Sequence, residues 1–273
     1  MTKKQRFGFF FNRIRADALA ALFDSQELQD GFHGTHEQHA FVMSVDIRGS
    51  TDLMLKARTA EAFALFITTL CNDFQMIVKD CYGVFDKFTG DGILAFFPEF
   101  FTGKDAGFFA VSAAHRCHMA FEKHYKANRT SFKAIPTDAG LGIGIDYGPL
   151  RIIPVADGLT VVGEPVVYAC RMGGAPAKKT FLNQMAYEQV NSRIAAHCSI
   201  NEADTPFKHE SRMLCYDTIL REQDYKPELP AWALNTSQHA TPDVAQEPKQ
   251  NVQSNKPSVD GDRDKRVGVG EKG

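Results

Sequence analysis

The sequence predicts an α+β fold, with a ferredoxin-like βαββαβ core to which further strands and helices are added. The apolar, β-branched run HAFVMSVDI at 39–47 is typical of a buried strand. Amphipathic helices are expected at 59–80 and 104–126, and a hairpin between them at 84–97. A glycine-rich strand at 139–148 then completes the order strand, helix, hairpin, helix, strand.

Composition and charge are those of an ordinary soluble globular protein. The 273 residues carry a net charge of −2, so no basic field favours nucleic acid or an anionic membrane. The six cysteines form no CxxC pair and lie mostly in apolar segments, which is typical of free thiols in a reducing compartment. We find no secretory signal and no run of about 18 apolar residues. These features predict a cytoplasmic protein without direct membrane contact.

The chain divides into three parts. Residues 1–38 are expected to form an N-terminal extension with a short helical pattern, and residues 39–234 to form the main domain. From residue 235 the composition changes to Pro, Gln, Asn, Asp and Lys, and apolar residues nearly vanish. Such a segment buries too little apolar surface to offset the entropy of ordering, so we expect 235–273 to be a disordered tail.

Two sets of histidines are candidate metal ligands, and neither is favoured. His33, His36 and His39 would share one side of a helix, but an intervening glycine and the lack of apolar framing favour a loop. His115 and His118 lie on one side of the second long helix without a carboxylate or cysteine to complete a set. We expect these two to be packed or surface histidines.

The end of the first strand has a pattern suited to phosphate and metal. The strand ends in Asp46, and the turn Gly49, Ser50 and Thr51 opens a helix. Turn amides and a helix N-terminus face an anion in such a geometry. Alternatively, Thr51 or Asp52 is only an N-cap. That alternative does not explain an aspartate at the end of an apolar strand.

The hairpin carries a second acidic position. Its TGDG turn at 89–92 places Asp91 at the tip, and Lys87 precedes Asp91 by four residues. In a β-α-β arrangement the ends that carry Asp46 and Asp91 can sit side by side. Two nearby carboxylates indicate a pair of divalent ions, Mg²⁺ or Mn²⁺ by their preference for oxygen. Two metals beside a phosphate-facing turn suggest phosphoryl chemistry.

The strand at 139–148 has glycines on one face only. Gly140, Gly142 and Gly144 alternate, which allows another backbone or a ligand to approach closely. The spacing is wrong for a dinucleotide fingerprint, and no helix opens after it. Two more short strands are expected at 150–155 and 159–162.

A helix expected at about 162–172 carries Arg171 among apolar side chains. A buried cation is costly unless it meets an anion, so Arg171 is a candidate anion-binding residue. Alternatively, it reaches solvent at the helix C-terminus, where a cation is favoured. The remaining elements expected are a strand, a helix and a hairpin at 180–182, 183–196 and about 205–221.

Four segments in order resemble the motifs of class III nucleotide cyclases. They are VDIRGST at 45–51, KFTGD at 87–91, GIGIDYG at 142–148 and GEPVVYACR at 163–171. The resemblance covers about residues 39–220, and four ordered motifs are far more specific than one. It implies two divalent ions, Mn²⁺ or Mg²⁺, in each active site.

The resemblance also assigns roles to individual residues. It implies that Asp46 and Asp91 bind the metals with the Ile47 carbonyl assisting. It implies that Lys87 and Thr160 read the base. Arg171 would match the arginine that stabilises the transition state. The family works as a homodimer in which one chain supplies the aspartates and the other supplies the lysine, threonine and arginine.

Departures from the family pattern affect the nucleotide end of the site. The family asparagine that orients the ribose is Val167 here, and Glu164 and Pro165 replace a common Asp-Thr or Asn-Thr pair. With the long run at 46–58, these departures resemble the pyrimidine cyclases of bacterial Pycsar anti-phage systems. The resemblance then implies a UTP or CTP substrate and a product that acts on a separate effector. The alternatives are an adenylate cyclase, favoured by Lys87 and Thr160, and an inactive nucleotide-binding module, favoured by Val167.

Overall fold

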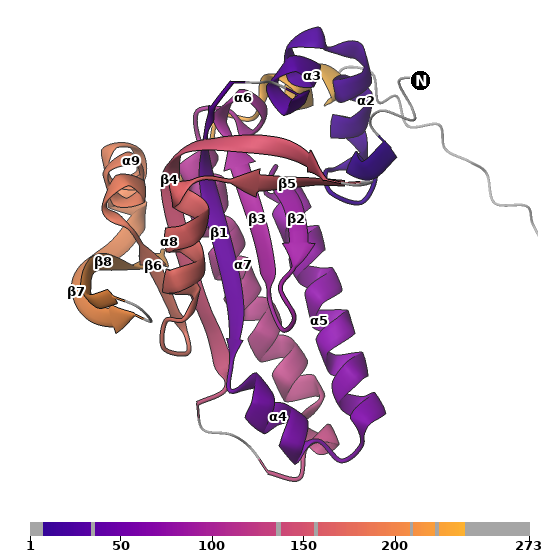
Figure 1. The fold of residues 1–273 in the computed structure, drawn as a ribbon, viewed down its shortest axis with the longest axis vertical. Helices are drawn as coiled ribbons and strands as arrows, with labels where there is room; N and C mark the ends of the chain where they lie inside the picture. Colours follow the sequence, from indigo (N-terminus) through magenta and orange to yellow (C-terminus); the bar gives the residue numbers. More distant parts are fainter. Residues whose placement is uncertain are drawn as a thin grey trace, which may run out of the picture. The chain divides into compact units, whose positions relative to one another are not determined.

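The computed structural model describes residues 8–33, 36–134, 138–155, 158–207, 210–221 and 224–237 (Figure 1). The expected disordered tail therefore lies outside the described residues, apart from 235–237. The strands are β1 (Gln38–Arg48), β2 (Val84–Phe88), β3 (Ile93–Pro98), β4 (Gly140–Val155), β5 (Gly158–Val162), β6 (Lys179–Leu182), β7 (Cys198–Phe207) and β8 (Glu210–Leu220). The helices are η1 (Gly8–Phe10), α2 (Ala16–Asp24), α3 (Gln26–His33), α4 (Ser50–Lys56), α5 (Ala60–Asp80), α6 (Glu99–Thr102), α7 (Ala106–Ala127), η2 (Arg129–Ser131), α8 (Glu164–Gly173), α9 (Gln184–Ile194), η3 (Ala195–His197) and α10 (Ala231–Ser237).

The predicted βαββαβ core is confirmed. Strand β1 pairs antiparallel with β3 on one side and β4 on the other, and the sheet order is β2-β3-β1-β4-β6-β8-β7. The first four strands of this order form the ferredoxin-like half. Strand β6 joins parallel to β4, and the β7–β8 hairpin extends the sheet beyond it. The core and its additions thus form one continuous sheet.

The two faces of the sheet have different roles. Alternate residues of β1 (Met43, Val45, Ile47) join the main apolar core with helices α5 and α7. The opposite face carries α8 and the N-terminal helices (Figure 1). Ser44, Asp46 and Arg48 alternate with the core residues and therefore belong to this second face.

Helix α5 is held in the core by its aromatic stripe. Phe66, Leu70 and Phe74 are fully or almost fully buried against the sheet. By length and composition, α5 is the one described helix apolar enough to cross a membrane. Core helices of globular proteins pass the same test.

Strand β4 is longer than the sequence predicts. Two separate strands were expected at 139–148 and 150–155, but one strand runs from Gly140 to Val155. The strand continues through Pro149 because its partner changes: it pairs with β1 as far as Leu150 and with β5 from Arg151 onward. The β4–β5 hairpin thereby extends beyond the sheet core toward the N-terminal helices (Figure 1).

Both ends of the described chain contain more structure than expected. The N-terminal extension holds η1, α2 and α3, and Phe10, Leu22 and Phe32 are buried in a second apolar cluster with β4 and β5. The terminal hairpin was expected from about residue 205, but β7 begins at Cys198, because the ladder with β8 extends to the pair Cys198 and Leu220.

Candidate active site

Asp46 is presented on the α8 face of the sheet by the alternation of β1. Its neighbours Val45 and Ile47 are buried in the core, while its own carboxylate is about one-third exposed. Nη1 of Arg48, two residues later on the same face, lies 2.6 Å from Oδ2 of Asp46. The carboxylate is therefore oriented by Arg48 and accessible from solvent.

The hairpin turn brings Asp91 to the same end of β1. In the β1–β3 ladder Val45 pairs with Ile93, so the turn lies beside Asp46. A methyl group on Gly92 would lie 1.9 Å from the carbonyl oxygen of Val45, and only glycine permits this approach. The turn itself has Gly90 at φ 96°, a left-handed conformation that favours glycine. The local sequence thus brings the two aspartates to adjacent positions.

The donor set at this place suits a hard divalent cation. Two carboxylates, Asp46 and Asp91, lie at the ends of adjacent strands, and the side chain of Ile47 is buried, so only its main chain can contribute. Oxygen ligands of this kind fit Mg²⁺ or Mn²⁺. Within the described part of the chain, no group of three or more His, Cys, Asp or Glu side chains offers a competing site.

The turn after β1 is formed by glycine rather than by a side-chain cap. Gly49 is the N-cap of α4 with φ 72°, and no side chain caps the helix. The alternative that Thr51 or Asp52 caps this helix is therefore wrong; Asp52 pairs with Lys56 instead. Beside the turn is a cavity of about 490 Å³, which Arg48, Gly49 and Lys178 help to line. Lys178 is a cation that the sequence did not single out.

The fold brings together Lys87 and Thr160, the two residues to which the sequence resemblance assigns base reading. Nζ of Lys87 on β2 donates to Oγ1 of Thr160 on β5 at 2.6 Å, across 73 positions of sequence. The Lys87 side chain is 48% exposed, so the pair remains accessible from solvent. Strand β5 reaches this position because it folds back from the long β4 beside β2.

Asp86 lies behind this pair, and sequence reasoning missed it. Its side chain is fully buried, with Oδ2 3.2 Å from the Thr160 hydroxyl, which donates to it, and 3.3 Å from Nζ of Lys87. Burial raises the pKa of Asp86, while Lys87, Thr160 and Arg13 oppose that shift. The sequence did contain a sign of its importance, because Asp86 is an aspartate within an apolar strand and directly precedes Lys87.

Helix α8 places Arg171 in its last turn. The guanidinium carbon lies 5.5 Å from the ring centre of Tyr168, and the side chain is only partly buried. Sequence reasoning placed Arg171 deep in an apolar helix, but one side of α8 is open: Val167 is 48% exposed. Burial alone therefore does not require an anion beside Arg171, and a cation is favoured at a helix C-terminus in any case.

The same helix explains the alternating glycines of β4. A methyl group on Gly144 would lie 2.2 Å from the carbonyl oxygen of Ala169, so the backbone that approaches this strand is that of α8. On α8, the thiol of Cys170 bonds to Ser44 and lies near Lys87 and Asp86. Cys170 is exposed, but partial desolvation by its neighbours raises the pKa of the thiol, which keeps it protonated. The glycine face thus seats the helix that carries Arg171.

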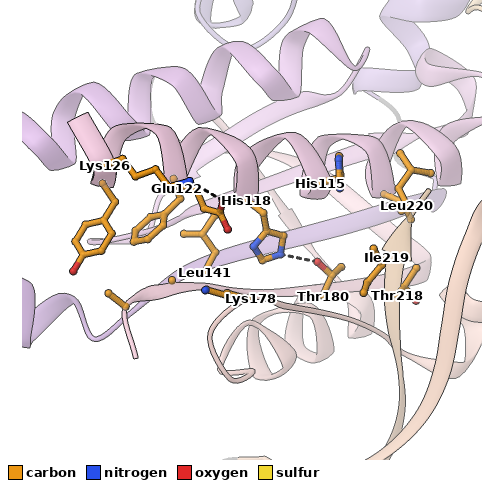
Figure 2. Close-up of a pocket in the computed structure, with 15 residues that line it drawn as sticks. His115, His118, Glu122, Lys126, Leu141, Lys178, Thr180, Thr218, Ile219 and Leu220 are labelled. Atoms are coloured by element: carbon orange, nitrogen blue, oxygen red, sulfur yellow. Dashed lines mark hydrogen bonds and ion pairs between the residues drawn. The ribbon is translucent and has the colours of Figure 1, made fainter. Parts of the chain in front are cut away.

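The histidines lie apart from these residues. His33 ends α3 and His39 lies in β1, so the N-terminal set does not share a helix. His115 and His118 line a cavity of about 580 Å³ between α7 and the sheet (Figure 2). The charged side chain of Lys126 lies at one end of this cavity, and the apolar side chain of Leu220 lies at the other. His118 is partly buried, and its Nε2 lies 3.0 Å from Oγ1 of Thr180. It is a packed histidine.

Several solved structures resemble this fold, and they are nucleotide cyclases. The adenylyl cyclase CyaB from P. aeruginosa superposes with a TM-score of 0.60 at 22% identity, covering 70% of this chain and 98% of that chain. The guanylyl cyclase Cya2 gives 0.59 at 18% identity, covering 71% and 98%. The guanylate cyclase domain of RhGC from Catenaria anguillulae, in complex with GTP, gives 0.53 at 17% identity, covering 68% and 98%.

The fold is that of class III adenylyl and guanylyl cyclase domains. No protein-family model and no curated protein matches the sequence. The cyclase fold is therefore shown by the three-dimensional structure, because the identities of 17–22% are too low for these searches of the whole sequence to find a match. It spans almost the whole of each of these solved domains.

Proposed function

We propose that this chain is a nucleotide cyclase that converts a nucleoside triphosphate, UTP or CTP, into the 3′,5′-cyclic monophosphate and pyrophosphate. The observation that carries the proposal is the placement of the motif residues on the cyclase fold. Asp46 and Asp91 lie at adjacent strand ends, while Lys87 and Thr160 form a separate pair 2.6 Å apart. A cyclase needs two such sets of residues, one that binds the metal ions and phosphates and one that recognises the base.

In the proposed reaction the ribose 3′-oxygen attacks the α-phosphorus, the bond from this phosphorus to the β-phosphate oxygen breaks, and the hydroxyl proton passes to solvent. Divalent ions, when bound, lower the pKa of the hydroxyl and neutralise the phosphates. Asp46, Asp91 and the Ile47 carbonyl would hold these ions. Gly49, Ser50 and Thr51 would face the phosphates, and Arg171 would meet the charge that develops on the α-phosphoryl group.

The proposed enzyme is a head-to-tail homodimer with shared sites. Within one chain, Lys87 is bound to Thr160 and Asp86, whereas Asp91 lies against β1. We therefore assign the aspartates of one copy and Lys87, Thr160 and Arg171 of the second copy to each site. The product would act on a separate cyclic-nucleotide-responsive effector in anti-phage defence, a role that rests on the sequence resemblance.

Incubation of the purified protein with each of ATP, GTP, CTP and UTP, with Mn²⁺ or Mg²⁺, tests the proposal. Cyclic UMP or cyclic CMP is the expected product, and Asp46→Asn or Asp91→Asn should abolish it. Asp52→Asn is the matched control, because Asp52 lies on the neighbouring helix and pairs with Lys56. Absence of any cyclic product in the wild type would leave the inactive nucleotide-binding module.

An adenylate cyclase is the second candidate. The bonded pair of Lys87 and Thr160 favours it, because a lysine donor beside a hydroxyl also fits the edge of adenine. Exclusive formation of cyclic AMP in the four-nucleotide assay would establish this candidate and overturn the pyrimidine assignment.

A further inference from the structure

Arg13, in the N-terminal extension, connects the two strands that carry the base-reading pair. Its Nη1 donates to the backbone carbonyls of Asp86 on β2 and of Leu159 on β5, the latter at 3.1 Å. The same nitrogen lies 3.5 Å from Oδ1 of the Asp86 carboxylate. The backbone N–H of Phe85 in turn donates to the carbonyl of Arg13 at 2.9 Å. Both the main chain and the side chain of Arg13 are thus bound to this place.

This connection matters because β2 and β5 do not pair with each other. Strand β2 pairs with β3, and β5 pairs with β4. Among the described strands, no backbone ladder therefore fixes Lys87 relative to Thr160. Their relative position depends on the side chains between them, and Arg13 provides contacts to both strands at once.

Charge gives a second reason. Asp86 is fully buried, and a buried carboxylate needs a compensating cation. Arg13 and Lys87 both lie within ion-pair distance of it. Without Arg13, Lys87 would be the remaining cation of this cluster and would be held more tightly toward Asp86, away from an incoming base.

Asp86 also orients the hydroxyl of Thr160. That hydroxyl accepts a hydrogen bond from Lys87 and donates its proton in a hydrogen bond to Asp86. One lone pair of its oxygen therefore remains to accept a hydrogen bond from the nucleotide. The pair therefore offers one donor, Lys87, and one acceptor, Thr160.

We propose that Arg13 is a positioning residue for nucleotide selection: through Asp86 and the carbonyls of β2 and β5 it fixes Lys87 and Thr160 as a donor and acceptor pair. This inference rests on the proposed cyclase function and deepens it. It makes the N-terminal extension a part of the substrate site.

The test compares Arg13→Gln, Arg13→Lys and Asp86→Asn with Arg15→Gln. Arg15 lies in the same segment but pairs with Asp17, so its variant is the matched control. In the full chain, kcat and KM are measured for all four nucleotides with Mn²⁺. Amide hydrogen exchange of β2 and β5 is measured on the same samples, which gives a readout that does not depend on activity.

We expect Arg13→Gln to raise KM for the preferred nucleotide about tenfold, as for the loss of a hydrogen bond to a charged group, with a smaller change in kcat. Discrimination between bases should fall, and exchange should accelerate in β2 and β5 but not in β1. Arg13→Lys should recover part of the KM effect. Asp86→Asn should change the order of base preference, because an amide can donate to Thr160 and release its proton.

Unchanged KM and base preference in Arg13→Gln, with an active wild type, would overturn the positioning role and leave the cyclase assignment intact. Equal loss of kcat for all four nucleotides, with faster exchange throughout the sheet, would show a merely structural role and would also overturn it. A wild type that forms no cyclic nucleotide would instead overturn the proposed function itself, and this inference with it.

Discussion

Arg171 is the residue whose proposed role can be separated experimentally from substrate binding. Its guanidinium stacks on Tyr168 at the end of α8, and its side chain remains partly exposed. If it meets charge that develops only during the reaction, Arg171→Ala should lower kcat about 10²–10³-fold with little change in KM. Steady-state kinetics with the preferred nucleotide measure this. Arg171→Lys should recover little, because an ammonium lacks the planar fork. A kcat equal to that of the wild type would contradict the role.

His118 predicts a pH dependence of stability. Burial, assisted by nearby His115, lowers the pKa of His118 from 6.5 to about 4, while Asp217 opposes the shift. Between these values the unfolded chain binds a proton that the folded chain does not, so stability should fall as the pH drops from about 6.5 to about 4. Over this range the free energy of unfolding should fall by about 3 kcal/mol in total.

Urea unfolding at several pH values measures this dependence. His118→Gln should flatten the pH profile, even if the loss of its bond to Thr180 lowers stability at neutral pH. The two profiles would run parallel if this histidine were not the titrating group.

At the residue scale, sequence reasoning predicted the positions that follow from local pattern. Asp91 at a glycine turn and Asp46 at a strand end could be predicted because each position depends on its immediate neighbours. Asp86 and Arg13 could not, because they are 73 positions apart and their contact depends on how β2 meets the extension. Arg171 was placed in a buried setting because apolar neighbours in sequence do not show which side of a helix is covered.

At the scale of elements, Gly92 lets the turn of the β2–β3 hairpin, which carries Asp91, lie close against β1. Any side chain there would collide with the Val45 carbonyl, which is rigid backbone of the central strand. Gly92→Ala should therefore push the turn away from β1, cost about 2 kcal/mol and abolish the response to Mn²⁺.

Gly90→Ala, in the same turn, is the contrasting variant. Gly90 has open space around it, so a methyl group there should cost only backbone strain, about 1 kcal/mol, and leave Asp91 in place. Thermal unfolding and metal-dependent activity measure both variants. Equal activity in the two would mean that the approach of the turn to β1 is not needed.

The elements that sequence reasoning missed share one cause. Strand β4 continues past Gly148 and Pro149, and β7 begins at Cys198, because pairing partners supply hydrogen bonds that compensate for weak local propensity. The alternating glycines predicted a close approach correctly. Which segment approaches, helix α8, became clear only from the packing.

At the scale of the whole molecule, exposed apolar side chains occur on the two strands that carry Lys87 and Thr160 and on α8. Phe88 on β2, Val162 on β5 and Val167 on α8 are 43–48% exposed. Exposed apolar groups of this kind are typical of a surface that another protein covers. A second copy of this chain would cover them in the proposed homodimer.

Mixing two inactive variants tests the shared site. Asp46→Asn chains keep Lys87, Thr160 and Arg171, whereas Arg171→Ala chains keep both aspartates. If equal amounts exchange at random, half of the dimers are mixed and each mixed dimer has one intact site, so about a quarter of wild-type activity should return. A mixture of Asp46→Asn with Asp91→Asn is the control: neither chain has a complete metal set, and no activity should return. If one chain held a whole site, the first mixture would be no more active than its components, and the two aspartates would then work with the arginine of their own chain.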